Sequence, residues 1–232
     1  MLGKIKKYIK DKYAIYIGWR LLEKWKSMAK KRGYSDINDL IDKGADNMIQ
    51  RAIKKLFEGY YVKLESGTIL DVGAGTGRVA REINKYIPRS VKILCLEIDV
   101  SLFHFLKKYI MTQKWPNVTV KLGDYFDYNF RNESFEVVIM PWFIQLSLYK
   151  WARVFEVGSK IIKANGYFIF DFIDSQDSLL EKINNPANAP HLLINGKDVE
   201  KIANHFGFIK KSEFDIGFNG LTTRYFIYQK QC

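Results

Sequence analysis

Three glycines, Gly73, Gly75 and Gly77, directly follow an apolar run that ends at Asp71. Glycine lets a backbone turn tightly and approach a ligand with no Cβ in the way. A glycine loop between a strand and a helix is typical of sites for nucleotide-like ligands. The dinucleotide spacing G-x-G-x-x-G needs a glycine at position 78, where this chain has Arg78. We therefore expect a nucleotide-like ligand that is not NAD.

The elements that must position this loop alternate along the chain. Short apolar runs alternate with stretches of helical spacing, which predicts βαβ units and a mostly parallel sheet. Two closing strand-like runs are joined by Asn219-Gly220, a tight-hairpin signal. The predicted strands are 67–72, 91–97, 117–122, 135–141, 166–173, 208–218 and 221–229, and the predicted helices are 77–87, 101–111, 147–163 and 196–206.

The run from Asp71 to Gly77, D-x-G-x-G-x-G, resembles motif I of class I (Rossmann-like) S-adenosylmethionine-dependent methyltransferases. The resemblance implies S-adenosylmethionine as the cofactor. It also implies an α/β fold with helices on both faces of a seven-stranded, mostly parallel sheet of order 3-2-1-4-5-7-6, strand 7 being antiparallel. The residues of this loop implied to bind the cofactor are Asp71, Gly73, Ala74, Gly75 and Gly77.

An acidic residue at the end of the second strand is implied as the ligand of the ribose hydroxyls. Glu97 lies about 20 residues beyond the glycines, the distance that one helix and one strand require. Glu97 is favoured because the apolar run stops there, with Ile98 next to it in the cofactor site. Asp99 is the competing candidate.

Two later segments complete the resemblance. Asp124 is implied to accept from the adenine amino group and Tyr125 to pack on or donate to the ring, although Asp124 also suits a capped turn after a strand. Trp142 follows the fourth strand and is a candidate wall of the substrate site, although an aromatic residue there is also ordinary core.

The N-terminal part predicts a basic helical appendage over residues 1–62, followed by the methyltransferase domain over residues 63–232. Residues 1–35 carry eleven Lys or Arg against Asp11 and Glu23, and so hold most of the net charge of +12. Tyr13 and Tyr16 lie on the apolar side of this segment as substrate-binding candidates. It could be a lid over a small-molecule acceptor, which we favour, or a docking surface for RNA or protein. A catalytically silent cofactor-binding protein is the remaining alternative.

Composition narrows the chemistry further. The two cysteines and three scattered histidines offer no metal-ligand spacing, so no metal is expected. Cysteine-dependent pyrimidine methylation and adenine amine methylation are both disfavoured, because Cys95 lies in a strand and Met140-Pro-Trp-Phe143 lacks a leading polar acceptor. No membrane span or signal peptide is apparent, and a cytoplasmic protein is expected. The catalytic residues, the methyl acceptor and the oligomeric state are left open; Tyr149, Asp171 and His191 are candidate bases by type alone.

Overall fold

A computed structural model describes residues 37–59, 62–131, 133–141, 151–172, 196–218 and 221–232, with isolated positions 27, 30, 31 and 33. The chain divides into two compact units, Met1–Asp46 and Asn47–Cys232, and the second unit holds the sheet. Residues 1–35, the basic part of the predicted helical appendage, fall almost wholly outside the described residues.

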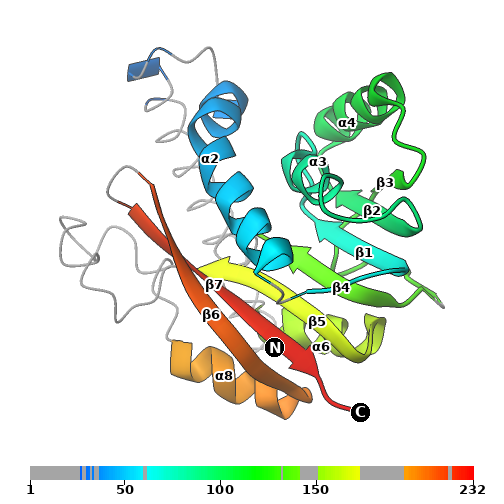
Figure 1. Cartoon of the computed structure of the whole chain (residues 1–232), viewed down its shortest axis with the longest axis vertical. Coiled ribbons are helices and arrows are strands. Elements are labelled where there is room, and N and C mark those ends of the chain that lie inside the picture. The colour runs from blue at the N-terminus through cyan, green and yellow to red at the C-terminus, as the bar shows by residue number, and fades with distance from the viewer. Residues whose placement is uncertain are drawn as a thin grey trace, which may run out of the picture. The chain divides into compact units, whose positions relative to one another are not determined.

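The sheet has seven strands among the described residues, in the order β3-β2-β1-β4-β5-β7-β6 (Figure 1). β1 to β5 pair in parallel, and β7 is antiparallel to both β5 and β6. This confirms the predicted fold class, order and reversed strand. The strands are β1 (Gly67–Val72), β2 (Val91–Glu97), β3 (Val118–Leu122), β4 (Phe135–Met140), β5 (Ile162–Phe172), β6 (Phe208–Phe218) and β7 (Leu221–Lys230).

Helices cover both faces of the sheet, and a separate apolar core fills each interface. The helices are α2 (Ile37–Glu58), α3 (Arg78–Ile83), α4 (Val100–Gln113), α6 (Trp151–Ile161) and α8 (Gly196–His205). One core contains side chains of α2 from Met48 onward, of α3 and of α4, and the other contains side chains of α6 and α8. The central strands are buried on both faces, which explains why their sequences read as continuous apolar runs.

The last turns of α2 belong to the core of the sheet. Met48, Ile49, Ala52, Ile53 and Leu56 follow helical spacing and are at most 5% exposed. The compact unit accordingly begins at Asn47. The boundary predicted at residues 62 and 63 stays a prediction, and the burial of this helix face argues for moving it toward residue 47.

Most predicted element bounds lie within a few residues of those observed, and β5 differs for a clear reason. It begins at Ile162 rather than at residue 166, because the residues before Gly166 form an irregularity inside the strand instead of a turn that precedes it. Phe135 pairs with Ile162 while Val137 pairs with Tyr167, so the intervening residues bulge. Asn165 sits there at a left-handed φ of 64°.

Candidate cofactor site

The glycine loop leaves the carboxyl end of β1 and enters α3. Gly73, Gly75 and Gly77 all have positive φ, at 68°, 55° and 85°. Residues with a Cβ rarely adopt this backbone conformation, so the sequence needs glycine at all three positions. The N–H groups of Gly73 and Ala74 donate to the Leu96 carbonyl at 2.9 and 3.1 Å, which fixes the loop against the end of β2.

Gly77 has a second reason to be glycine, which is close packing between helices. A Cβ on Gly77 would lie 2.4 Å from Cδ1 of Leu106 on α4. A Cβ on Gly75 would meet only the Gly73 carbonyl oxygen, at 3.9 Å, so space is open beside the loop there. The loop is therefore packed tightly below Gly77 and accessible at Gly75.

Glu97 ends β2 with a carboxylate that is 5% exposed and directed at the loop. One oxygen, Oε2, accepts from the Gly75 N–H at 2.6 Å, and the other, Oε1, accepts from the Asp99 N–H at 2.8 Å. The predicted ribose ligand thus lies against the predicted cofactor loop. Ile98, the next residue, is 63% exposed, which leaves an apolar surface beside the carboxylate.

Asp99 has a structural task instead. Its Oδ1 accepts from the Leu102 N–H at 2.9 Å, in the first turn of α4, as an N-cap carboxylate does. Of the two candidates for the ribose ligand, Glu97 is the one whose carboxylate contacts the glycine loop. This geometry supports Glu97, which remains a prediction.

Asp71 is the most unusual group in the site. It is completely buried at the end of β1, and neither carboxyl oxygen has a hydrogen-bond partner. Burial, and after it the negative charge of Glu97, raise its pKa from 3.8 to about 7, although the nearby Ala80 N–H and the Arg78 charge favour the ionised form. A positively charged ligand group bound beside this buried carboxyl would stabilise its ionised form.

Asp124 and Tyr125 follow β3 and are tied into local structure. Oδ1 of Asp124 accepts from the Phe126 N–H at 2.9 Å, so the capped turn considered from the sequence is present. Tyr125 is 3% exposed, and its hydroxyl donates to the Val154 carbonyl at 3.1 Å on α6. The Tyr125 ring is therefore held in the core, and its predicted contact with adenine has no support from its side-chain position.

A pair that the sequence did not reveal lies nearby on β5 and β7. Asp171 and Tyr225 are register partners, and both are completely buried. The Tyr225 hydroxyl has no hydrogen-bond partner, and its pKa is raised by burial and then by the charge of Asp171, with Arg78 opposing. Strand alternation puts Asp71 and Asp171 on the same face of the sheet, two residues beyond Ile69 and Ile169 in the same core cluster. No sequence signal marks Tyr225, because its contact with Asp171 depends on the register between β5 and β7, which the sequence does not show.

The other predicted site residues lie outside the described residues: Trp142, Tyr13 and Tyr16, together with the candidate bases Tyr149 and His191. In the part of the chain that the structure describes, no group of three or more His, Cys, Asp or Glu could hold a metal ion.

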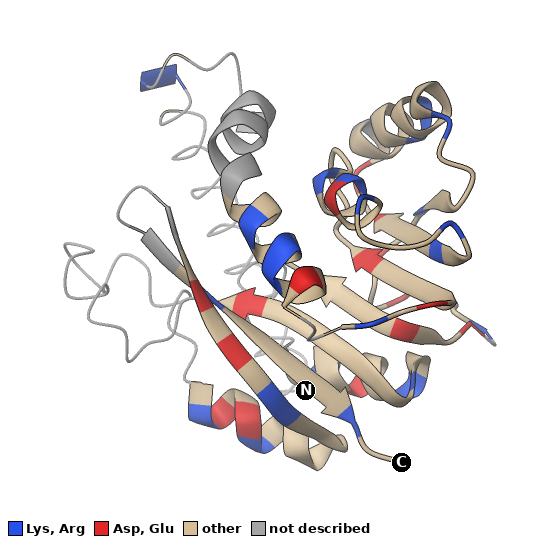
Figure 2. Ribbon diagram, viewed as in Figure 1, with Lys and Arg blue, Asp and Glu red and all other residues tan. Residues whose placement is uncertain are grey.

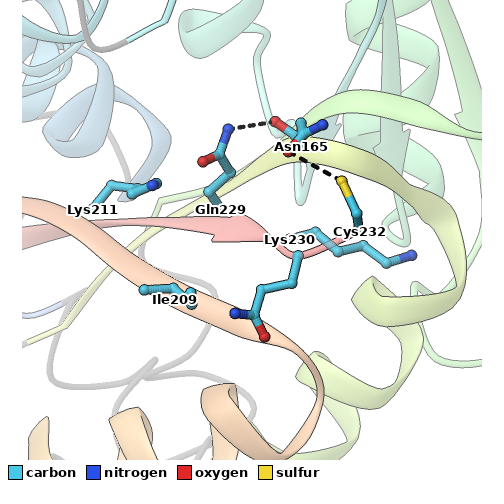
Figure 3. Close-up of a pocket in the computed structure, with 7 residues that line it drawn as sticks. Asn165, Ile209, Lys211, Gln229, Lys230 and Cys232 are labelled. Carbon is cyan, nitrogen blue, oxygen red and sulfur yellow. Dashed lines mark hydrogen bonds between the residues drawn. The ribbon is translucent and has the colours of Figure 1, made fainter.

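A hollow of about 450 Å³ lies elsewhere, between the start of β5 and the last residues of β7 (Figure 3). Its lining is mostly polar and includes Asn165, Lys211 and Gln229, with the Gln229 amide donating to the Asn165 carbonyl at 2.9 Å. It is at the amino end of the parallel strands, the opposite edge from the glycine loop, and so it is not part of the candidate cofactor site.

Comparison with known proteins agrees with this geometry. Residues 69–166 match the family model described as a methyltransferase domain. The demethylmenaquinone methyltransferase of Porphyromonas gingivalis is 24% identical over 136 residues, which cover 56% of this chain. The matched part spans about half, 54%, of that relative's length.

Solved structures show the same fold. The magnesium protoporphyrin IX methyltransferase of Synechocystis PCC 6803, solved with bound S-adenosylhomocysteine, aligns with a TM-score of 0.63 at 14% identity, covering 82% of this chain and 85% of that one. An S-adenosylmethionine-dependent methyltransferase from Aquifex aeolicus aligns with a TM-score of 0.60 at 13% identity, covering 79% and 97%. At these identities the likeness is one of fold.

The strand order, the glycine loop and the structural neighbours define the class I S-adenosylmethionine-dependent methyltransferase fold. The match of residues 69–166 to a methyltransferase domain agrees with the class that the sequence predicts. The class uses S-adenosylmethionine as its methyl donor, which confirms the predicted cofactor.

Proposed function

We propose that this chain transfers a methyl group from S-adenosylmethionine to a small-molecule acceptor, with the cofactor bound across the carboxyl ends of β1 and β2. The observation that carries the proposal is the buried Asp71 carboxyl beside a glycine loop that Glu97 holds at 2.6 Å. A positively charged ligand group would compensate Asp71, and a hydroxylated ribose would suit the Glu97 carboxylate.

The residues divide the binding between them. The backbone of Gly73, Ala74, Gly75 and Gly77 would lie along the cofactor, with the open space at Gly75 admitting it. Ile98 would cover one side of the adenine, and Asp124 would contribute its carboxylate at the end of β3. Tyr125 would act through its backbone, since its hydroxyl is bonded to Val154.

The sulfonium supplies an activated methyl group, which an acceptor atom takes by direct displacement. This chain's task is then to hold the acceptor in line and to exclude water, and a dedicated base is not obligatory. Where the acceptor must lose a proton, the carboxyl of Asp171 is the described group that could take it, at the carboxyl end of β5.

Two classes of acceptor are considered, a small molecule and a macromolecule. A small molecule suits the aromatic residues Tyr13 and Tyr16 of the N-terminal segment, which could line an apolar acceptor site under a lid. An RNA or protein acceptor is the alternative, favoured by the eleven Lys and Arg within residues 1–35. Residues 1–35 would then be a docking segment rather than a lid.

Calorimetric titration with S-adenosylhomocysteine tests the proposal. The full chain should bind it. Asp71→Asn and Glu97→Gln should each bind it at least about tenfold more weakly, because a charge-assisted hydrogen bond is worth about 1.5 to 3 kcal/mol. The control Glu213→Gln, at an exposed position on β6, should bind it as tightly as the unaltered chain. Absence of binding to the full chain would refute the proposal.

The acceptor class needs its own measurement. Transfer of a labelled methyl group from S-adenosylmethionine should appear in the small-molecule fraction of a cell extract. Label found only in RNA or protein would favour the macromolecular alternative.

A further inference from the structure

The segment from Val100 to Gly123 has an unusual charge pattern. It contains Lys107, Lys108, Lys114 and Lys121 and no Asp or Glu over 24 residues. The segment forms α4 and the edge strand β3, and Figure 2 draws α4 with blue positions and no red ones. Arg89, in the turn before β2, lies at the same end as the last residues of α4. Between Asp99 and Asp124, the charged residues of this edge are therefore all basic.

The same edge exposes large apolar side chains. Phe105 and Met111 on α4 are 54% and 71% exposed, although a solvent-facing helix side normally carries polar residues there. Five of the six exposed large hydrophobics among the described residues lie between residues 98 and 122: Ile98, Val100, Phe105, Met111 and Leu122. Ile98 and Leu122 adjoin Glu97, whereas Phe105 and Met111 lie on a helix that contributes no predicted cofactor ligand.

Aromatic rings link this helix to a shallow hollow. Phe105 stacks on Tyr109 at 6.3 Å between centroids, and Tyr109 meets Trp115 edge-on at 5.5 Å. Trp115 lines a hollow of about 410 Å³ together with Met111, Pro116 and Val118, and the cations Arg89 and Lys114 also line it. Apolar side chains and two cations thus share one concave surface.

We propose that this surface, formed by α4 and the hollow at its end, docks on an anionic lipid membrane. Phe105 and Met111 would enter the boundary between headgroups and acyl chains, and Trp115 and Tyr109 would lie at the headgroup level that amphipathic rings prefer. Lys107, Lys108, Lys114 and Arg89 would contact anionic headgroups.

The alternatives fit this surface less well. A second copy of the chain would bring two acid-free basic faces together, and the like charges would repel. A nucleic acid would satisfy the cations, but the aliphatic side chain of Met111 gains little from phosphates. A bilayer accepts both the apolar groups and the positive charge.

Co-sedimentation of the full chain with vesicles tests the proposal. Vesicles of phosphatidylglycerol and phosphatidylcholine should bind the chain more tightly than pure phosphatidylcholine. Phe105→Ser with Met111→Ser should reduce partitioning into the anionic vesicles by at least about tenfold. Neutralising Lys107, Lys108 and Lys114 to Gln should reduce it by about fivefold for each charge removed. Ile209→Ser, an exposed apolar residue on β6, is the matched control and should change nothing.

Residues 1–35 are also basic, so a second readout must locate the contact. In a Cys232→Ser background, which leaves only the buried Cys95, an environment-sensitive dye is attached at Met111→Cys or at Ile209→Cys. The dye at position 111 should shift to the blue on anionic vesicles, and the dye at 209 should not.

Unchanged emission at position 111, with full partitioning of the Phe105 and Met111 variant, would overturn the proposal and assign any lipid binding to other residues. Binding of a short RNA that depends on the three lysines, without vesicle binding, would overturn it in favour of a nucleic-acid face.

Discussion

The Glu97 carboxylate accepts a hydrogen bond from the backbone N–H of Gly75 at 2.6 Å, which joins the end of β2 to the glycine loop after β1. Its other oxygen accepts from the Asp99 N–H, so a single side chain bonds both the glycine loop and the turn that leads into α4. A ligand that forms a hydrogen bond with Glu97 is therefore linked to the glycine loop through the same carboxylate.

Replacing Glu97 with Gln should weaken binding of S-adenosylhomocysteine by about tenfold or more, because a charge-assisted hydrogen bond is worth about 1.5 to 3 kcal/mol. Asp99→Asn is the matched comparison. It keeps a hydrogen-bond acceptor at the N-cap of α4 and removes only the negative charge there, so it should lower stability by at most about 1 kcal/mol while leaving affinity unchanged. Calorimetry and urea unfolding measure the two effects. Weaker binding in Asp99→Asn alone would show that the ribose ligand is Asp99.

Ligand choice should follow the spacing of the glycines. S-adenosylhomocysteine at about 100 times its dissociation constant should stabilise the chain by roughly 2.7 kcal/mol, and NAD should have no effect. A thermal-shift experiment with both ligands gives the answer. Stabilisation by NAD alone would mean that the loop is a dinucleotide site despite Arg78.

Asp71 should make stability depend on pH. Its pKa rises from 3.8 to about 7 on folding, so the folded chain holds a proton that the unfolded chain releases over that interval. The free energy of unfolding should therefore fall as pH rises from 4 to 7, relative to Asp71→Asn, and the difference should level off above pH 7. Urea unfolding across that range measures it. Parallel curves for the two proteins would contradict the burial of an unpartnered carboxyl.

The same carboxyl should couple cofactor binding to protons. A cationic ligand group favours ionised Asp71, so the affinity for S-adenosylhomocysteine should increase between pH 6 and pH 8. Titration in buffers of different ionisation enthalpy should detect a released proton. Asp71→Asn should lose this proton release.

Replacing Tyr225 with Phe should raise the stability of the fold without changing cofactor affinity. The hydroxyl is buried without a partner, so its removal should stabilise the chain by about 1 kcal/mol, or roughly 2–4 °C in melting temperature. Affinity for S-adenosylhomocysteine should not change. A loss of stability would reveal a partner for the hydroxyl in the folded protein.

The parts of the fold that could be predicted are those visible in the sequence of a single strand, helix or loop. Alternating apolar runs, the glycine loop and the resemblance to a known class led to the strand order, and the apolar run ending at Glu97 located the end of β2 within the sequence. The positions of the strands depend on local pattern, which the sequence displays directly, whereas their order came from the resemblance.

Features that depend on strand register or on packing between distant segments could not be predicted from the sequence. Tyr125 was assigned to the adenine ring, but α6 offers its hydroxyl the Val154 carbonyl, a contact between segments 29 residues apart. The pairing of Asp171 with Tyr225 requires the register of two antiparallel strands. The boundary at residues 62 and 63 stays a prediction, and the packing of α2 onto the sheet was not accessible to it, because amphipathic spacing shows that a face is buried but not against what.

Strand β7 has a consequence for how the protein is made. It pairs with β5 on one side and β6 on the other, although it follows both in the chain. During synthesis, the edge of β5 stays unpaired until β7 has left the ribosome, and until then Phe170 lacks its stacking contacts with Phe226 and Tyr228. Completion of the sheet is thus a late event, and ribosomes stalled before residue 221 should release aggregation-prone chains that need chaperones.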